Sequence, residues 1–318
     1  MSRTVSGAIP DVRLSRRAAV GRLASTGAAA AIAAAQVGTY TGAAEAASPR
    51  VQSSIAATQE GTVMTDTSDA RRPVPTVVLV HGAFADSSCW NGVIELLQAD
   101  GITTTTAPNP LRGITHDAAY VASYLNQIPG PVLLVGHSYG GAVITNAGSR
   151  AENVVGLVYV AGFAPDDGET LLAIEQESRD SVLLTALVPL QYPTGNGTET
   201  ATEFAINPEK IQEAFAADLS ASQNAVLAAT QRPIAELAFA EPTTAPAWKS
   251  LPAWAVIPTG DKAVGTDALR FMTERTGATI TEIDASHVVM ISQPQAVTDV
   301  IMTAFNAVSQ PRLAGRVA

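Results

Sequence analysis

Residues 131–141 of this chain read Pro-Val-Leu-Leu-Val-Gly-His-Ser-Tyr-Gly-Gly. The apolar run up to Val135 is typical of a buried strand, and a Gly-x-Ser-x-Gly pattern follows it directly and opens a helix. A strand that reverses into a helix within a residue or two leaves Ser138 strained, with its hydroxyl above the edge of the sheet. Gly136 and Gly140 suit this turn, because a side chain at either position would collide across it. The stretch therefore predicts a nucleophilic serine at Ser138; the alternative is a glycine-rich turn without chemistry.

The sequence on either side of this stretch alternates short apolar runs, which predict strands, with amphipathic runs, which predict helices. The expected strands are 76–80, 102–106, 131–135, 154–160, 253–258 and 278–284, and the expected helices are 90–97, 117–128, 142 onward, 265–276 and 294–308. Strands that are apolar on both faces and separated by helices indicate a parallel sheet covered on both sides. Residues 168–250 break the alternation with mostly helical pieces, within which 192–200 reads as a loop.

A serine hydroxyl needs a nearby imidazole to become an effective nucleophile. The four histidines of the chain are His81, His116, His137 and His287. Of these, His287 follows the expected strand 278–284 and is best placed at the carboxyl edge of the sheet. Asp261 follows strand 253–258, so the chain order Ser138, Asp261, His287 matches the order that accompanies the Gly-x-Ser-x-Gly turn. Asp166 and Asp167, after strand 154–160, are the rival candidates for the acid.

A second glycine-containing loop, His81-Gly82-Ala83-Phe84, follows the expected strand 76–80. From its place after this strand, we expect the backbone amide of Ala83 to point at a substrate carbonyl oxygen. The amide of Tyr139, the residue after the nucleophile, is the expected second donor of the oxyanion hole. We expect His81 to bond the loop rather than to act as a base. The alternative, a phosphate-binding loop, is disfavoured because the lysine of the Gly-x-x-x-x-Gly-Lys pattern is missing.

The composition of the chain narrows the classes of partner. Its 318 residues contain 19 Lys+Arg and 29 Asp+Glu, a formal net charge of −10. An acidic protein lacks the basic surface that nucleic acids require, and it does not suit a polybasic membrane-surface helix. The single cysteine, Cys89, excludes an intrachain disulfide and a cysteine-based zinc site, and we expect it to be a small buried residue. No metal or organic cofactor is needed for the predicted chemistry.

The first 46 residues differ from the rest. They contain five arginines against Asp11 and Glu45, and the pair Arg16-Arg17 precedes an alanine-rich run. A basic start, an apolar middle and a small-residue end predict an export signal, and the paired arginines favour the twin-arginine type. The alternative is an alanine-rich disordered leader. A membrane anchor is disfavoured, because no apolar stretch of about 20 residues is free of charge. Residues 47–73, rich in Ser, Thr and Gln, read as a flexible lead-in to a catalytic domain at 74–310.

Several motifs together resemble the α/β-hydrolase superfamily over residues 76–308. Val78-Leu79-Val80-His81-Gly82-Ala83, Cys89-Trp90, Asp261-Lys262, His287 and Gln293-Pro294 are similar to the group of plant methylesterases, hydroxynitrile lyases and their bacterial serine esterase relatives. The resemblance implies an α/β-hydrolase fold, a mostly parallel central sheet flanked by helices with a helical cap insertion at about 168–250. It also implies a Ser-His-Asp triad and small ester substrates.

One departure from this group bears on the reaction. Its hydroxynitrile lyases carry a lysine directly after the catalytic histidine, whereas this chain has Val288. The sequence therefore favours a secreted serine esterase. A catalytically idle protein that binds a small ligand, and a cofactor-free perhydrolase or hydroxynitrile lyase on the same site, remain as alternatives.

The substrate chamber is expected between the two loops and the cap. Phe84, Leu111 and Leu187 are the predicted substrate-binding residues, with Tyr139 beside them. Further cap candidates are Leu183, Leu184 and Phe215. For each cap residue, ordinary core packing is an equally good interpretation. The sequence does not indicate an oligomeric state.

Overall fold

The computed structural model describes residues 73–310. The expected export signal at 1–46 and the expected lead-in, apart from its last residue, lie outside the described residues. The centre of the described part is a six-stranded sheet with the strand order β2-β1-β3-β4-β8-β9, in which every neighbouring pair is parallel. These strands are β1 (Thr76–Val80), β2 (Thr104–Ala107), β3 (Val132–His137), β4 (Val154–Val160), β8 (Ala253–Pro258) and β9 (Thr279–Ile283). The predicted parallel sheet is confirmed.

Burial along the strands explains why this sheet forms. All residues of β3 and β8 are buried, and so are all but one of β1 and of β4. Such continuous apolar runs are stable only when helices cover both faces of a sheet. Strand β3 lies in the interior of the sheet between β1 and β4, and its carboxyl end leads directly to Ser138.

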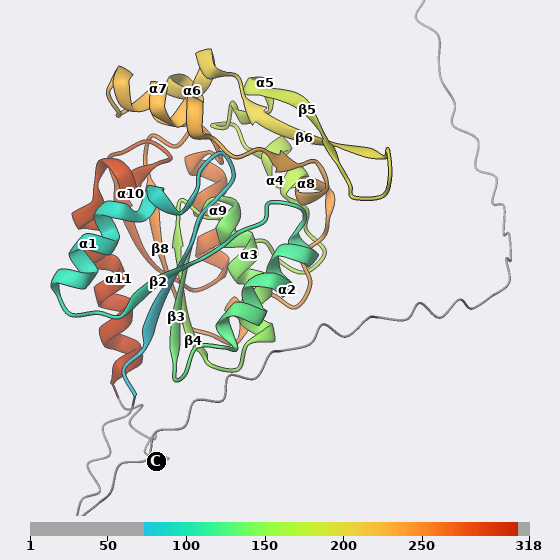
Figure 1. Ribbon diagram of the computed structural model, residues 1–318. Coiled ribbons are helices and arrows are strands. Elements are labelled where there is room, and N and C mark those ends of the chain that lie inside the picture. The colour runs from blue at the N-terminus through green and yellow to red at the C-terminus, as the bar shows by residue number, and fades with distance from the viewer. Residues whose placement is uncertain (1–72, 311–318) are drawn as a thin grey trace, which may run out of the picture. The chain divides into compact units, whose positions relative to one another are not determined.

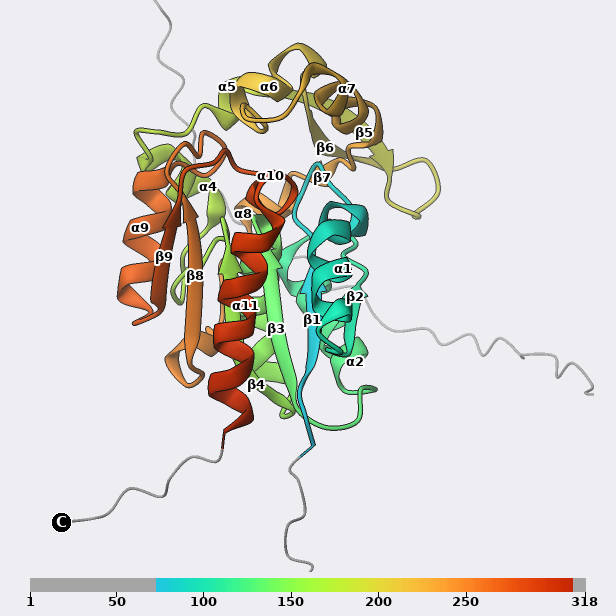
Figure 2. The ribbon, with the colours of Figure 1, turned by 90° about the vertical axis from the view of Figure 1, so that its left-hand side faces the viewer.

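Helices cover the two faces of this sheet (Figures 1 and 2). One face carries α1 (Asn91–Ala99) and α11 (Pro294–Ser309), and the other carries α2 (Ile114–Leu125), α3 (Tyr139–Ala147) and α9 (Thr266–Arg275). A short α10 (Val289–Ser292) follows His287, and short 3-10 turns cover Ser87–Trp90 and Gly148–Arg150. Helix α3 begins three residues earlier than expected, since the helix starts at the residue directly after Ser138.

The cap is inserted between β4 and β8 and lies over the carboxyl ends of the strands (Figure 2). Its helices are α4 (Leu171–Glu177), α5 (Leu183–Ala186), α6 (Ile211–Ala214), α7 (Ala221–Thr230) and α8 (Leu237–Ala240), with two 3-10 turns at Pro208–Lys210 and Ala247–Lys249. It also contains an antiparallel sheet of β5 (Leu187–Pro193), β6 (Thr200–Ile206) and β7 (Ile234–Ala235), in the order β5-β6-β7.

The loop expected over 192–200 is confirmed for 194–199, but its ends belong to strands, and the mostly helical cap also contains a small sheet. Residues 192 and 193 pair with 201 and 200 in a long hairpin, and only 194–199 form its turn. Pro189 and Pro193 made this segment look unlike a strand. Proline is tolerated there because β5 is an edge strand, where an amide can be missing without loss of a ladder bond.

Two further observations concern the described residues alone. None of the helices between residues 73 and 310 is long and apolar enough to cross a membrane. The same residues contain no group of three or more His, Cys, Asp or Glu side chains arranged to hold a metal ion.

Candidate active site

Ser138 occupies the sharp turn between β3 and α3, as the Gly-x-Ser-x-Gly pattern predicts. Its φ of 54° and ψ of −125° lie in a region that L-residues rarely adopt. The turn is this tight because its glycines touch backbone. A Cβ at Gly136 would lie 2.5 Å from the carbonyl oxygen of Gly140, and one at Gly140 would lie 2.5 Å from that of Val80. The packing of these glycines therefore enforces the strained backbone at Ser138.

His287 and Asp261 meet at the carboxyl edge of the sheet. His287 Nδ1 lies 2.6 Å from Asp261 Oδ2, and both side chains are fully buried. The other carboxylate oxygen, Oδ1, accepts hydrogen bonds from the amides of Ala263 and Val264 at 2.9 Å and of Gly265 at 3.2 Å. The loop after β8 thus fixes Asp261, so that Oδ2 receives the Nδ1 proton of the imidazole and Nε2 is left free to accept one.

His137 connects His287 to the serine turn. Its Nε2 donates to the carbonyl oxygen of His287 at 3.1 Å, and the two imidazole rings are 4.7 Å apart. Burial, with a smaller contribution from His287, holds the pKa of His137 well below its usual range, so this ring is neutral. Within residues 73–310, His287 Nε2 is buried and has no hydrogen-bond partner. The free acceptor of the imidazole therefore belongs to a histidine anchored to His137, the residue directly before Ser138.

The loop after β1 packs directly against the serine. A Cβ at Gly82 would lie only 2.6 Å from the Cβ of Ser138. The amide of Phe84 is already used, because it donates to the carbonyl of Arg232 at 3.0 Å. No backbone hydrogen bond is recorded for the amide of Ala83 in the described part of the chain, and the amide of Tyr139 is the first of α3, where helices leave donors unpaired.

His81 bonds the loop in the way expected of a structural residue. Its Nδ1 donates to the carbonyl of Gly82 at 2.8 Å, and its Nε2 accepts from Arg232 at 3.2 Å. Burial lowers the pKa of His81, which keeps the ring neutral and able to do both. Asp166, a rival for the acid, lies at the surface and pairs with Lys249 at 2.5 Å.

The three predicted substrate-binding residues are not equivalent. Phe84 packs edge-on against Phe215 with ring centroids 6.1 Å apart, and Phe215 in turn lies 5.1 Å from the His287 ring. Leu111 is fully buried and accepts a backbone bond from Ala235 of the cap. Leu187 lines a cavity of about 710 Å³ in the cap, together with Leu172, Leu184, Tyr192, Thr194, Ala201, Thr202, Phe204, Glu236, Leu237, Phe239 and Ala240.

Some contacts at this site carry no signal in the sequence. Asp218 of the cap accepts from the amide of Ser286 at 3.0 Å and also from its hydroxyl, and so ties the loop before His287 to the cap. Asp117 accepts from the hydroxyl of Tyr139 at 2.8 Å and anchors the start of α3. Each pair joins residues many positions apart, and neither belongs to a motif. Only the folded chain brings them together.

The comparisons with known proteins agree with this architecture. The alpha/beta hydrolase family model matches residues 77–300. A carbendazim hydrolyzing esterase of Nocardioides sp. (strain SG-4G) is 31% identical over 110 residues, which is 30% of this chain and 46% of that protein. A pyrethroid hydrolase of Sphingobium wenxiniae is 28% identical over 160 residues, which is 46% of this chain and 56% of that protein. The chain thus spans about half the length of these two curated relatives.

Solved structures extend the likeness over nearly the whole described region. The structure of polyneuridine aldehyde esterase superposes with a TM-score of 0.62 at 21% identity, covering 73% of this chain and 99% of that one. At this level of identity the likeness concerns the fold. The family model covers most of the chain, and the sheet order, the serine turn and the cap insertion agree with it: the chain belongs to the alpha/beta hydrolase family.

Proposed function

We propose that this protein is a serine hydrolase that cleaves small carboxylic esters, with Ser138 as nucleophile, His287 as base and Asp261 as the acid that orients it. The observation that carries the proposal is the buried contact of 2.6 Å between His287 Nδ1 and Asp261 Oδ2, on a histidine whose Nε2 has no partner among the described residues. The strained turn at Ser138 supports it, since such strain is concentrated at functional sites.

In the first step, Ser138 Oγ attacks the ester carbonyl while His287 Nε2 accepts the hydroxyl proton. Asp261 keeps the other proton of the ring on Nδ1 and stabilises the imidazolium that forms. The three amides on Asp261 Oδ1 hold the carboxylate in this orientation. The tetrahedral intermediate then collapses: His287 returns the proton to the leaving alcohol oxygen, and the acyl group stays on Ser138.

The backbone amides of Ala83 and Tyr139 stabilise the negative charge that develops on the carbonyl oxygen of the ester, by donating hydrogen bonds to it. The bond of the Phe84 amide to Arg232 supports this choice in part, because it removes Phe84 as a donor while the amide of Ala83 has no backbone partner among the described residues. Loss of one such donor costs about 3 kcal/mol of transition-state stabilisation. In the second step, His287 takes a proton from water, the hydroxide attacks the acyl-serine, and the acid is released as Ser138 regains its proton.

The test is hydrolysis of short-chain p-nitrophenyl esters by the full chain and by Ser138→Ala. We expect a burst of p-nitrophenol followed by steady turnover from the wild type, and neither from the variant. Equal release from both would overturn the proposal and favour the idle ligand-binding alternative. A panel of methyl, aryl and lactone esters then identifies the preferred class. Because the two curated relatives are named for hydrolysis of carbendazim and of pyrethroids, the panel also includes these two kinds of compound.

The lyase and perhydrolase alternatives are separated by two further assays. Val288 is fully buried and offers no ammonium group for a cyanide leaving group. We therefore expect ester cleavage to exceed cyanohydrin cleavage, and faster cyanohydrin cleavage would contradict the role given to Val288. Perhydrolysis by the same triad would convert acetate and hydrogen peroxide into a peracid. The peracid is detected because it oxidises a halide and so bleaches a halide-dependent indicator dye.

We also propose that residues 1–46 direct export by the twin-arginine route, that 47–73 form a flexible lead-in and that 74–310 are the catalytic domain. The basis is the Arg16-Arg17 pair ahead of an alanine-rich run. Replacing both arginines by lysine should retain the full-length protein inside an expressing bacterium. Unchanged secretion of the double variant would contradict this assignment.

A further inference from the structure

Glu175 is a buried acidic residue that the proposed mechanism does not use. It lies on the buried face of α4 with Leu171 and Ile174, at a helical position where an apolar side chain is expected, and only 3% of it is exposed. Its Oε1 has no hydrogen-bond partner among the described residues. Its Oε2 lies 2.6 Å from the hydroxyl oxygen of Ser181.

The hydrogen bonds around Ser181 indicate where the protons are. Ser181 Oγ also lies 2.7 Å from the carbonyl oxygen of Ala263, and it accepts from the amide of Leu183 at 3.2 Å. A hydroxyl has one proton to donate and two lone pairs with which to accept. A carbonyl oxygen cannot donate, so the Ser181 proton satisfies Ala263. The contact to Glu175 is then a hydrogen bond only if the carboxyl group donates. With a protonated Glu175, all three contacts of Ser181 are satisfied at once.

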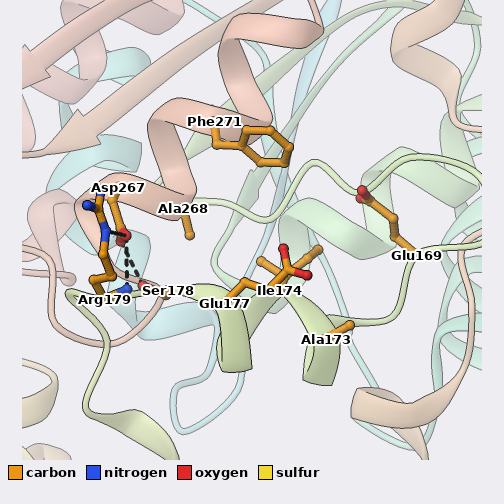
Figure 3. Close-up of a pocket in the computed structure, with 9 residues that line it drawn as sticks. All are labelled: Glu169, Ala173, Ile174, Glu177, Ser178, Arg179, Asp267, Ala268 and Phe271. Atoms are coloured by element: carbon orange, nitrogen blue, oxygen red, sulfur yellow. Dashed lines mark hydrogen bonds and ion pairs between the residues drawn. The ribbon is translucent and has the colours of Figure 1, made fainter.

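The charges around Glu175 favour the same state. No ion pair of Glu175 occurs within residues 73–310, and the charged groups that face it are Asp261 and, on α9, Asp267. Arg179, four residues further along the chain, is mostly exposed and pairs with Asp267 at 3.4 Å (Figure 3). Burial, together with these two carboxylates, raises the pKa of Glu175 well above its usual range, and this outweighs the lowering by any bond that Ser181 would donate to an ionised carboxylate.

The segment that follows Glu175 is bonded to the loop that fixes the acid of the triad. The amide of Val182 donates to the carbonyl of Lys262 at 2.9 Å, next to the Ser181 contact with Ala263. Earlier in the same segment, Ser178 Oγ and the backbone amide of Arg179 donate to Asp267 (Figure 3). The loop held from this side supplies the three amides on Asp261 Oδ1.

We propose that Glu175 is a positioning residue that carries a proton in the folded protein and, through Ser181, holds the 261–265 loop in the conformation that orients Asp261. Loss of this proton turns the single Ser181 proton toward the carboxylate, breaks the bond to the Ala263 carbonyl and places a second negative charge near Asp261. The kinetic part of the inference rests on the proposed function; the protonation state does not.

The decisive variant is Glu175→Gln. Its amide nitrogen can donate to Ser181 Oγ as the protonated acid does, and it stays neutral at every pH. We expect kcat and KM of this variant to match the wild type at neutral pH. Ser181→Ala, which removes the link, should lower kcat on the order of tenfold with KM unchanged, because small misplacements of catalytic groups are costly. The matched control is Glu177→Gln, an exposed position on the same helix. If Glu175→Gln loses as much kcat as Glu175→Ala, an ionised Glu175 is needed and the proposal fails.

Thermal stability tests the protonation state without any turnover. A carboxyl group with a raised folded-state pKa favours the folded protein below its unfolded value of about 4.3, and this contribution is lost as the pH rises toward the folded value. The Tm of the wild type should therefore fall relative to Glu175→Gln between pH 4 and pH 9. Glu177→Gln should run parallel to the wild type.

Infrared spectroscopy gives a second, independent readout on the full chain. At neutral pH the wild type should show the carbonyl stretch of a protonated carboxylic acid, and Glu175→Gln should lack it. Parallel Tm profiles of the wild type and Glu175→Gln, or a wild-type spectrum without this band, would overturn the inference. Both results stand even if no ester is hydrolysed, so failure of the proposed esterase function is distinguishable from failure of this one.

Discussion

Gly82→Ala tests how closely the loop after β1 is fitted to the nucleophile. The added Cβ would lie 2.6 Å from the Cβ of Ser138 and 2.9 Å from the carbonyl oxygen of His137, whereas ordinary contacts begin at 3.4 Å. The first contact is therefore 0.8 Å too short against the shortest ordinary distance of 3.4 Å. Neither neighbour can yield easily, because Ser138 belongs to a turn of packed glycines and the His137 oxygen is backbone.

A displacement of this size separates the nucleophile from its partners. Misplacement of a reacting group by about 1 Å can cost roughly 100-fold in rate, which corresponds to ~2.7 kcal/mol. We expect Gly82→Ala to lower kcat by this order, with a smaller change in KM. The assay is steady-state hydrolysis of a p-nitrophenyl ester, with circular dichroism to show that the variant is folded.

The matched control is Gly168→Ala. Gly168 has a φ of +81°, and a Cβ there would meet no heavy atom of residues 73–310 within 4 Å, so alanine strains the backbone without touching the site. It should cost stability, on the order of 1 kcal/mol, and leave kcat unchanged. A kcat loss below about fivefold for Gly82→Ala, under ~1 kcal/mol, would refute the claim that this loop is fitted to Ser138.

Three other substitutions probe the site from different sides. Asp261→Asn should keep the fold but lower kcat by about 10⁴-fold, because it favours the wrong tautomer of His287; a pH–rate profile with wild-type kcat would contradict this role. Phe215→Ala should lower the free energy of unfolding by about 3–5 kcal/mol in urea denaturation, as for other buried aromatics, and a loss under ~1 kcal/mol would show that the ring is not part of the core. His137→Phe removes the hydrogen bond to the buried carbonyl of His287 and should lower the free energy of unfolding by about 1–3 kcal/mol in the same experiment. An unchanged urea midpoint would show that this bond does not stabilise the fold.

The sequence predicted the parts of the fold that local patterns determine. The strand ending at His137 could be read because an apolar run meets a glycine-bounded serine, and a side chain at Gly136 or Gly140 would strike backbone. The contact between Asp261 and His287 could be anticipated from two strand ends. Parallel strands deliver their carboxyl ends to one edge, and β8 and β9 are neighbours.

The cap was harder to predict, because its strands break the usual rules. Pro189 and Pro193 belong to β5, and they are tolerated there because β5 is an edge strand. Leu187 lines a cavity in the cap, and its role in substrate binding stays a prediction. Its apolar character suits both substrate binding and ordinary packing of the cap, so the sequence alone could not place it.

The polar contacts behind the site could not be read from the sequence at all. Glu175 appears as one more acid in an acidic chain, and Ser181 as an ordinary turn residue. Their meaning depends on burial and on an oxygen 82 positions further along, the carbonyl of Ala263. Hydrogen bonds of this kind have no spacing rule, since the tertiary fold alone decides which groups meet.

Covalent trapping of the acyl-enzyme tests the central claim most directly. The full chain is treated with a p-nitrophenyl ester or a fluorophosphonate, digested and analysed by tandem mass spectrometry. The account predicts a single adduct on Ser138, absent from Ser138→Ala and formed more slowly in His287→Ala. An adduct on another residue, or equal labelling of the wild type and Ser138→Ala, would contradict it.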